Sequence, residues 1–421
     1  MITNQTKTRA LVVGAGFGGV AAALTLTKAK SSALEITLIS NKPHFEYYPA
    51  LYRVVTGRSP LEVCIPLSAI FHGSKIEVVI DEITTLDPGT QTAAGLSGRR
   101  YGYDYAILAL GSETAYFDIP GLREFSFGFK SIQEASRLEK HLQALFKNCA
   151  GGETTQEDKV CLLHFVIVGA GPSGVELAGE LAGYLKQLAR HYRVAENLIT
   201  IDLFEGAGRI LPALPEAVAR RASRRLRALG VNIFVNRPLV SEEAEKIMVR
   251  GLSAKTETVI WTAGIKPNSF FQKIPGLTFD QRGRVIVDEY LRAKNQERIF
   301  VIGDGAATPY TGLAQTAIYD GRAAAVNISR LARGLKPLAY QPKPPSHAIP
   351  IGRGWGLAVL GTVIISGRFG WLIRRAADLR YFLSILPVRK ALLAFRPGKK
   401  ICRDCPICGK IKIIKKEEKT I

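Results

Sequence analysis

The hydrophobic positions of this chain alternate between short β-rich runs and longer stretches with helical spacing. Buried strands are predicted where β-branched and aliphatic residues cluster, at 10–16, 35–40, 103–112, 164–171, 199–205 and 298–306. Helical patterns follow at 18–29, from about 172 to 188, and at 313–331. This alternation is typical of α/β proteins with parallel sheets. With 421 residues the chain is too long for one ordinary core, so more than one domain is expected.

One strand–helix–strand unit occurs twice along the chain. Its glycine motif is Gly14-x-Gly16-x-x-Gly19, with Gly18 inside it, in the first unit and Gly169-x-Gly171-x-x-Gly174 in the second. In such a motif the first glycine makes a tight turn, the second lets a phosphate approach the backbone, and the third lets the helix pack on the strand. Amides at the helix N-terminus then face a pyrophosphate. A tight turn alone would account for one such motif, whereas two complete units predict two dinucleotide sites.

Glu205 closes the second strand of the second unit, 31 residues after Gly174. A carboxylate there accepts hydrogen bonds from ribose hydroxyls and repels a 2′-phosphate, which favours NADH over NADPH. Arg209 nearby weakens that preference. The corresponding strand of the first unit ends at Ser40, a hydroxyl partner rather than an acid. Thr262, Ala263 and Gly264 end a later strand with small residues, which would let a nicotinamide ring lie flat against an acceptor.

Several further motifs extend the pattern, and together they carry a family resemblance. They are HFEYYPALYRVVTG at 44–57, YDYAILALGS at 103–112, TAGIKPN at 262–268, GD at 303–304 and GLAQTA at 312–317. With the two glycine motifs, they resemble the flavoproteins with two dinucleotide-binding domains, and among these the type II NADH dehydrogenases. The resemblance covers about residues 8–395. It implies an enzyme in which the first unit binds FAD, the second binds NADH, and electrons pass to a quinone.

The resemblance also implies roles for individual residues. Asp304 would hydrogen-bond the ribityl or phosphate region of FAD, and Glu176 would lie near the nicotinamide ring. Gln315 would lie beside the flavin on the acceptor side, and the helix that begins near Leu313 would direct its N-terminal amides at the flavin. The catalytic candidates are therefore Glu176 and Gln315. The cofactor-binding candidates are Gly14, Gly16, Gly18, Gly19, Ser40, Gly111, Asp304, Ala314, Gln315, Gly169, Gly171, Gly174, Glu205, Thr262, Ala263 and Gly264.

The chain departs from the family at two positions that bear on the acceptor. Tyr319 and Asp320 stand where the family places glutamines of its quinone pocket. A sulfide:quinone oxidoreductase is one alternative, but it needs a pair of redox cysteines, and no cysteine lies between 162 and 401. A flavoprotein of the apoptosis-inducing-factor type, with slow NADH chemistry and a different acceptor, is another. Ferredoxin or another protein acceptor stays open.

The C-terminal segment concentrates positive charge. The whole chain has a net charge of +21, and residues 371–421 hold fourteen Lys and Arg against four Asp and Glu. Residues 370–395 mix aromatic and aliphatic residues with arginines, which suits a helix lying at an anionic membrane surface. The alternative is an amphipathic helix docked on the chain's own core or on a second copy in a homodimer. The chain has no run of eighteen apolar residues, so no spanning helix is predicted. Nucleic-acid binding by the basic tail is the weaker alternative, because its aromatic residues lie only upstream and no nucleic-acid-binding fold is recognised.

These observations give one expected organisation. The fold class is α/β, with two Rossmann-like domains and a C-terminal amphipathic helical segment. The FAD-binding domain is expected at 1–117 and 288–350, the NAD(H)-binding domain at 118–287, and the membrane-associating segment at 351–421. We expect a peripheral protein on the cytoplasmic side of the cell membrane. Cys402, Cys405 and Cys408 have metal-friendly spacing but no evident fourth ligand, so no metal is predicted.

Overall fold

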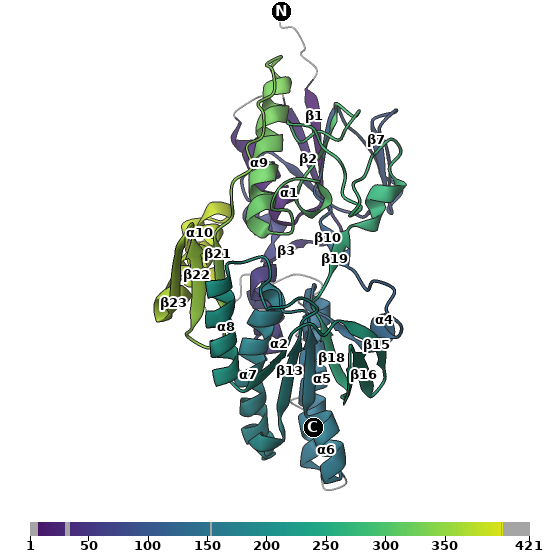
Figure 1. Cartoon of the computed structure of the whole chain (residues 1–421). Helices are drawn as coiled ribbons and strands as arrows, with labels where there is room; N and C mark the ends of the chain where they lie inside the picture. The colour runs from purple at the N-terminus through teal and green to yellow at the C-terminus, as the bar shows by residue number, and fades with distance from the viewer. Residues whose placement is uncertain (1–6, 30–33, 152–153, 397, 399–421) are drawn as a thin grey trace, which may run out of the picture.

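A computed structural model describes residues 7–29, 34–151, 154–396 and 398. The chain forms two α/β units stacked end to end, with a smaller C-terminal layer along one side (Figure 1). The cysteine cluster at 402–408 and the lysines after it lie outside the described residues. Among the residues described, no helix combines the length and the apolar character needed to span a bilayer.

The first unit is built on a five-stranded parallel sheet that takes its edge strand from late in the chain. Two helices, α1 (Phe17–Lys28) and α9 (Ala314–Leu331), pack against each other beside this sheet (Figure 1). They cross closely, because a Cβ at Gly321 would lie 2.3 Å from the Gly18 carbonyl oxygen. The sheet order is β20 (Ile299–Val301), β9 (Tyr105–Leu108), β1 (Thr8–Val13), β2 (Leu34–Ser40) and β5 (Glu77–Ile80).

Smaller elements complete the first unit. An antiparallel three-stranded sheet consists of β6 (Ile83–Asp87), β7 (Thr92–Gly95) and β8 (Arg100–Gly102). The 44–70 region contains β3 (His44–Glu46), α2 (Leu51–Val55), β4 (Cys64–Pro66) and α3 (Leu67–Ile70).

The second unit repeats the plan. Its five-stranded parallel sheet has the order β11 (Phe127–Gly128), β18 (Thr258–Trp261), β12 (His164–Val168), β13 (Thr200–Phe204) and β14 (Val231–Phe234). Its helices are α4 (Leu122–Phe125), α5 (Ile132–Ala150), α6 (Gln156–Leu162), α7 (Pro172–Tyr192) and α8 (Glu216–Ala228). An antiparallel sheet of β15 (Leu239–Glu243), β16 (Lys246–Val249) and β17 (Leu252–Lys255) flanks it. Where the chain passes between the units, β10 (Ser112–Thr114) pairs with β19 (Ile265–Pro267).

The C-terminal layer differs from the prediction in two respects. A proline-rich stretch lies at 337–345. The segment after it forms an antiparallel sheet of β21 (His347–Pro350), β22 (Gly356–Leu360) and β23 (Val363–Gly367), which the sequence pattern did not reveal. The predicted helical region 370–395 is two helices, α10 (Arg368–Ile385) and α11 (Val388–Phe395). They separate at Pro387, because a proline cannot donate the backbone hydrogen bond of a continuing helix.

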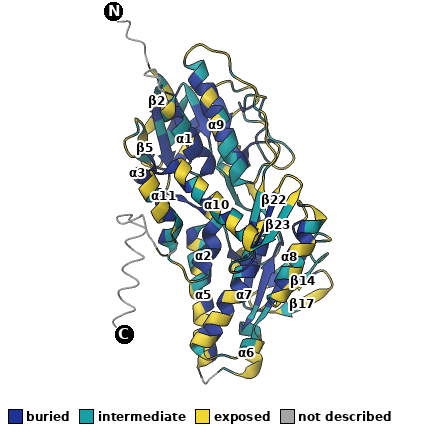
Figure 2. Cartoon of the chain, turned by 90° about the vertical axis from the view of Figure 1, so that its left-hand side faces the viewer, coloured by how far each residue is buried: buried dark blue, intermediate teal, exposed yellow. Residues whose placement is uncertain are grey.

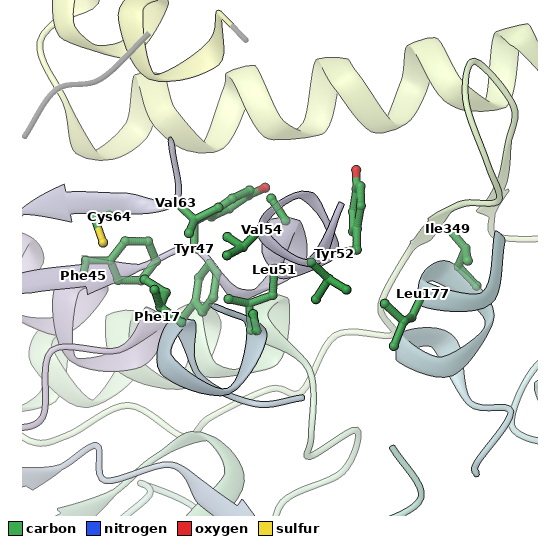
Figure 3. Packing of buried hydrophobic residues seen from close by; sticks show 14 of the residues in the cluster. Phe17, Phe45, Tyr47, Leu51, Tyr52, Val54, Val63, Cys64, Leu177 and Ile349 are labelled. Carbon is green, nitrogen blue, oxygen red and sulfur yellow. The ribbon is translucent and has the colours of Figure 1, made fainter. Parts of the chain in front are cut away.

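One continuous hydrophobic cluster joins all three parts. Phe17 from α1 packs edge-on against Phe45 with ring centroids 4.9 Å apart, and Tyr47 stacks on Tyr381 of α10 at 5.6 Å. Figure 3 shows these side chains of the 44–57 region between α1 and the second unit, where Leu177 meets Ile349 of the C-terminal sheet. The aromatic motif at 44–57 is therefore the central packing element of the molecule.

Candidate active site

Both glycine motifs form turns that tolerate no side chain at their first and third positions. Gly14 has φ +101°, and a Cβ there would lie 2.4 Å from the Ala109 carbonyl oxygen. A Cβ at Gly19 would lie 1.8 Å from the Gly14 carbonyl oxygen. At Gly16, in contrast, an added Cβ would meet nothing within 4 Å. The first and third glycines therefore serve packing, and the space at the second is left for a ligand.

The second turn repeats this geometry. Gly169 has φ +102° with Ala263 behind it, since a Cβ would lie 2.5 Å from the Ala263 Cα. A Cβ at Gly174 would lie 1.9 Å from the Gly169 carbonyl oxygen, whereas Gly171 is open within 4 Å. Gly16 is the N-cap of α1 and Gly171 is the N-cap of α7, and neither helix has a side-chain capping hydrogen bond. Both helices thus present uncapped N-terminal amides, which suit an anionic phosphate.

A cavity of about 570 Å³ lies at the seam between the two units. The N-terminus of α9 also meets it at Leu313 and Ala314, again without a side-chain cap. The predicted site residues that line this cavity are Gly14, Gly16, Gly18, Ser40, Gly111, Glu176, Thr262, Gly264, Asp304 and Ala314. The other predicted site residues do not line it: Gly19, Gly169, Gly171, Gly174, Glu205, Ala263 and Gln315.

Glu205 is held against the second glycine turn. Its two carboxylate oxygens accept hydrogen bonds from the backbone amides of Ala170 and Ala207, each at 2.8 Å. Arg209 donates to the carbonyl oxygens of Leu211 and Pro212, within its own loop. The guanidinium that weakened the expected NADH preference is therefore already engaged. Glu205 remains next to the turn where a ribose hydroxyl would have to bind.

A series of hydrogen-bonded side chains lines the cavity, and sequence reasoning did not identify it as a connected group. Ser112 donates a hydrogen bond to Asp304, and Lys130 donates to the Ser112 hydroxyl at 2.5 Å. All three side chains line the cavity. No local motif marks Lys130, because it lies 18 positions from Ser112, and Ser112 lies 192 positions from Asp304.

A second missed group lies near Ser40. Lys42 Nζ is 2.6 Å from Glu46 Oε1, and His44 Nε2 is 3.4 Å from the same oxygen. Burial raises the pKa of Glu46, but hydrogen bonds from His44 and Lys42 outweigh it, so this pKa lies below its ordinary value. Lys42, His44 and Glu46 all line the cavity, as does Ser40, the end of β2, where the sequence has a serine in place of an acid. An ionised Glu46 supplies a carboxylate there.

Glu176 sits one turn into α7 beside Arg374 of α10. The distance between Arg374 Nη1 and Glu176 Oε1 is 3.9 Å, and the Glu176 side chain is only 14% exposed. Burial raises the pKa of Glu176 from its ordinary value of 4.5 to about 8, although the Arg374 charge opposes this shift. At neutral pH the carboxyl group is protonated and can donate a hydrogen bond into the cavity.

This shift gives a pH dependence that Glu176→Gln should remove. The raised pKa means that the folded state holds the proton more tightly than the unfolded state. The resulting stability is complete below about pH 4.5 and is lost as the pH rises through 8. We expect the free energy of unfolding of the native chain, relative to Glu176→Gln, to fall by up to ~1.4 kcal/mol per pH unit across this range.

Urea unfolding at pH 5, 6, 7 and 8 measures this difference. Glu216→Gln, whose side chain is 69% exposed on α8, is the control and should give a pH-independent offset. Parallel pH profiles for the native chain and Glu176→Gln would show that the Glu176 proton does not distinguish folded from unfolded chain.

Gln315, Tyr319 and Asp320 occupy different surroundings. Gln315 donates from Nε2 to the Tyr319 hydroxyl at 3.0 Å and accepts from the Ser346 amide at 3.1 Å, which ties α9 to the proline-rich segment. Asp320 is fully buried and accepts a hydrogen bond from the Gly303 amide at 3.0 Å. Burial raises the pKa of Asp320 to about 6. Asp320 thus supports the turn that carries Asp304.

The described cysteines lie apart from the cavity. Cys64 and Cys149 are buried, Cys161 is half-buried, and none of them lines the cavity among the described residues. Within the same part of the chain, no group of three His, Cys, Asp or Glu side chains is placed to hold a metal ion. Among the described residues, therefore, no cysteine is placed for thiol–disulfide exchange in the cavity.

Two glycine turns, uncapped helix ends and a seam cavity define a two-nucleotide oxidoreductase fold. A family model described as pyridine nucleotide-disulphide oxidoreductase matches residues 8–321, and the chain belongs to that family.

Its relatives confirm the resemblance to type II NADH dehydrogenases. A type II NADH:quinone oxidoreductase of Mycobacterium tuberculosis is 29% identical over 92% of this chain and 87% of its own length. The enzyme of Staphylococcus haemolyticus is 26% identical over 94% of this chain and 99% of its own length.

Solved structures share the fold. NDH2 of Plasmodium falciparum, solved in complex with NADH, has a TM-score of 0.82 at 19% identity and covers 92% of this chain and 97% of its own. The sulfide:quinone oxidoreductase of Aquifex aeolicus has a TM-score of 0.75 at 20% identity, with coverage of 95% and 98%.

Proposed function

We propose that this chain is an FAD-dependent NADH:quinone oxidoreductase of the type II NADH dehydrogenase class. The observation that carries the proposal is the single cavity that reaches from the first glycine turn to the start of α7 behind the second. FAD bound there would supply the two-electron redox chemistry that links NADH to the acceptor. A cavity that reaches both the first glycine turn and the start of α7 would bring the two rings to one place.

Within this proposal the first unit, 1–117 and 288–350, binds FAD, and the second, 118–287, binds NADH. The uncapped amides at the start of α1 would hold the FAD pyrophosphate, and Asp304 with Ser40 and Glu46 would accept hydrogen bonds from its hydroxyl groups. Gly264 and Thr262 leave a flat surface for the nicotinamide. The protonated carboxyl of Glu176 is positioned to orient the carboxamide or to deliver a proton.

Steady-state turnover of purified holoenzyme tests the acceptor. We expect rapid NADH oxidation with a soluble ubiquinone or menaquinone analogue, and little with ferredoxin. Sulfide should not serve as an electron donor, because no cysteine lines the cavity within the described residues. Slow turnover with every quinone, alongside fast reduction of ferredoxin, would assign the chain a protein acceptor.

The NADH preference is expected to depend on Glu205. Glu205→Arg should change the ratio of kcat/KM for NADH over NADPH by at least tenfold toward NADPH, a difference of ~1.4 kcal/mol. The reason is that the change removes a ribose acceptor and supplies a cation for the 2′-phosphate. Glu196→Arg is the control, since that exposed side chain pairs with Arg190 away from the turn. An unaltered ratio in Glu205→Arg would remove Glu205 from cofactor discrimination.

We further propose that α10 and α11 place the enzyme on an anionic membrane surface, where quinone is available. Figure 2 shows both helices on one face of the molecule with many exposed residues. On this C-terminal apolar surface Phe369 is 73% and Val388 is 63% exposed. Its other exposed apolar residues are Leu372, Leu383, Leu392 and Leu393, and Arg368, Arg380 and Arg389 lie exposed among them. Apolar side chains beside arginines suit a lipid interface.

Substitution tests this surface better than truncation, because α10 also carries buried residues such as Phe382 and Asp378. We expect Val388→Glu with Leu392→Glu to abolish binding to phosphatidylglycerol vesicles while NADH reduction of a soluble dye is unchanged. Val240→Glu with Leu252→Glu, at exposed positions of β15 and β17, is the control. Retained sedimentation of the Val388/Leu392 variant with vesicles would show that lipid binds elsewhere.

A further inference from the structure

Lys130 is held in place by the second unit before its side chain enters the cavity. It follows β11, and Ser131, the next residue, is the N-cap of α5. The Ser131 hydroxyl accepts from the Glu134 amide, and the Glu134 carboxylate in turn accepts from the Lys130 amide at 2.7 Å. This reciprocal capping arrangement fixes the Lys130 backbone. The base of the side chain is therefore rigid relative to the second unit.

The far end of the side chain is attached to the first unit. Lys130 Nζ donates to Ser112 Oγ, and Ser112 uses its single hydroxyl proton to donate to Asp304 Oδ2. A hydroxyl can accept from an ammonium group and donate to a carboxylate at the same time, so Ser112 connects the Lys130 charge to the Asp304 charge. The chain of bonds links β11 of the second unit, β10 between the units and the strand-end turn of the first.

The surroundings of Lys130 distinguish it from the other lysine that lines the cavity. Lys42 is directly paired with Glu46 at 2.6 Å. Lys130 is instead connected to the Asp304 carboxylate through the Ser112 hydroxyl. Burial lowers the pKa of Lys130, and the charges of Asp304 and Glu134 oppose that shift. A half-buried ammonium group needs a counter-charge, and Asp304 supplies this charge through the intervening Ser112 hydroxyl.

We propose that Lys130 is a positioning residue for FAD: acting through Ser112, it orients the Asp304 carboxylate as the acceptor for an FAD hydroxyl. The inference rests on FAD being the cofactor, as proposed above, and adds a residue from the NADH-binding unit to the FAD site. It also makes FAD affinity depend on the contact between the two units. The position of Asp304 is then set from both sides, by the Lys130–Ser112 relay and by the Gly303 turn that Asp320 supports.

FAD titration of the apoprotein, followed by flavin fluorescence, tests this relay. We expect Lys130→Met and Ser112→Ala each to raise the FAD dissociation constant about tenfold, and Lys130→Arg to restore part of the loss. The double variant should be no weaker than either single variant, because both substitutions break the same connection. Lys140→Met, an exposed lysine on α5, is the matched control and should leave the constant unchanged.

Further measurements separate positioning from general damage. Thermal unfolding of the apoprotein and its affinity for NADH should be the same in Ser112→Ala as in the native chain. Native FAD affinity in both single variants, or losses that add in the double variant, would overturn the proposal. If Lys130→Met fails to fold, Ser112→Ala and Lys130→Arg decide the outcome. The FAD titration does not involve the acceptor, so failure of quinone turnover would leave this result standing.

Discussion

Replacing Gly19 with alanine is expected to give colourless protein that no longer retains FAD. The new Cβ would lie 1.8 Å from the Gly14 carbonyl oxygen, so the turn that we propose for the pyrophosphate would have to open. Gly174→Ala makes the equivalent clash, 1.9 Å from the Gly169 carbonyl oxygen. That variant should stay yellow but bind NADH at least a hundredfold more weakly, a loss of ~2.7 kcal/mol. Flavin absorbance after gel filtration and an NADH titration measure the two effects separately.

Gly183→Ala is the matched control for both substitutions. Gly183 lies exposed on α7, where an added Cβ meets nothing within 4 Å, and alanine there favours the helix by about 0.5–1 kcal/mol. Yellow Gly19→Ala protein, or simultaneous loss of both nucleotides from each variant, would contradict the assignment of one turn to each nucleotide.

Replacing Asp378 with asparagine is expected to destabilise the fold by about 3–5 kcal/mol, the usual cost of removing one partner from a buried ion pair. This carboxylate is 1% exposed and accepts from the Tyr47 hydroxyl at 2.6 Å. It also pairs with Arg53, Arg374 and Arg375 at 3.1–3.4 Å. Asparagine keeps the shape but leaves three guanidinium groups without this charge. Denaturant unfolding, with proteolysis of the segment before α10, measures the loss.

Glu216→Gln is the control for Asp378→Asn. Its carboxylate pairs with Arg220 on the exposed face of α8, so its removal should change stability by at most ~1 kcal/mol. Equal effects of the two substitutions would mean that the buried cluster does not hold α10 to the 44–57 region.

The sequence predicted the features that depend on neighbouring residues. Strand runs that end in glycine motifs identified both strand–helix–strand units, because the tight turn and the close helix contact restrict residue types locally. The helix that begins near Leu313 was predicted from its own local helical pattern, and it begins at Ala314. Family resemblance added Asp304 and Glu176, both of which line the cavity.

Contacts between distant segments could not be predicted in this way. Tyr47 and Asp378 are 331 positions apart, yet their hydrogen bond ties α10 to the 44–57 region of the first unit. The β21–β23 sheet was missed for a different reason, since its strands are short and follow a proline-rich stretch. Glu46 lies six residues beyond Ser40, the position at which an acid was sought. The segment 370–395 was expected to lie either on the membrane or on the core. Its helices α10 and α11 each bury some residues and expose others.

The central claim, that NADH reduces a flavin held in this cavity and that a quinone then oxidises it, is tested most directly by anaerobic rapid mixing of the yellow holoenzyme. NADH should bleach the flavin absorbance within the time of one steady-state turnover, and a subsequent addition of quinone should restore it equally fast. Bleaching that follows sulfide rather than NADH, or reduced flavin that quinone leaves colourless, would contradict the account.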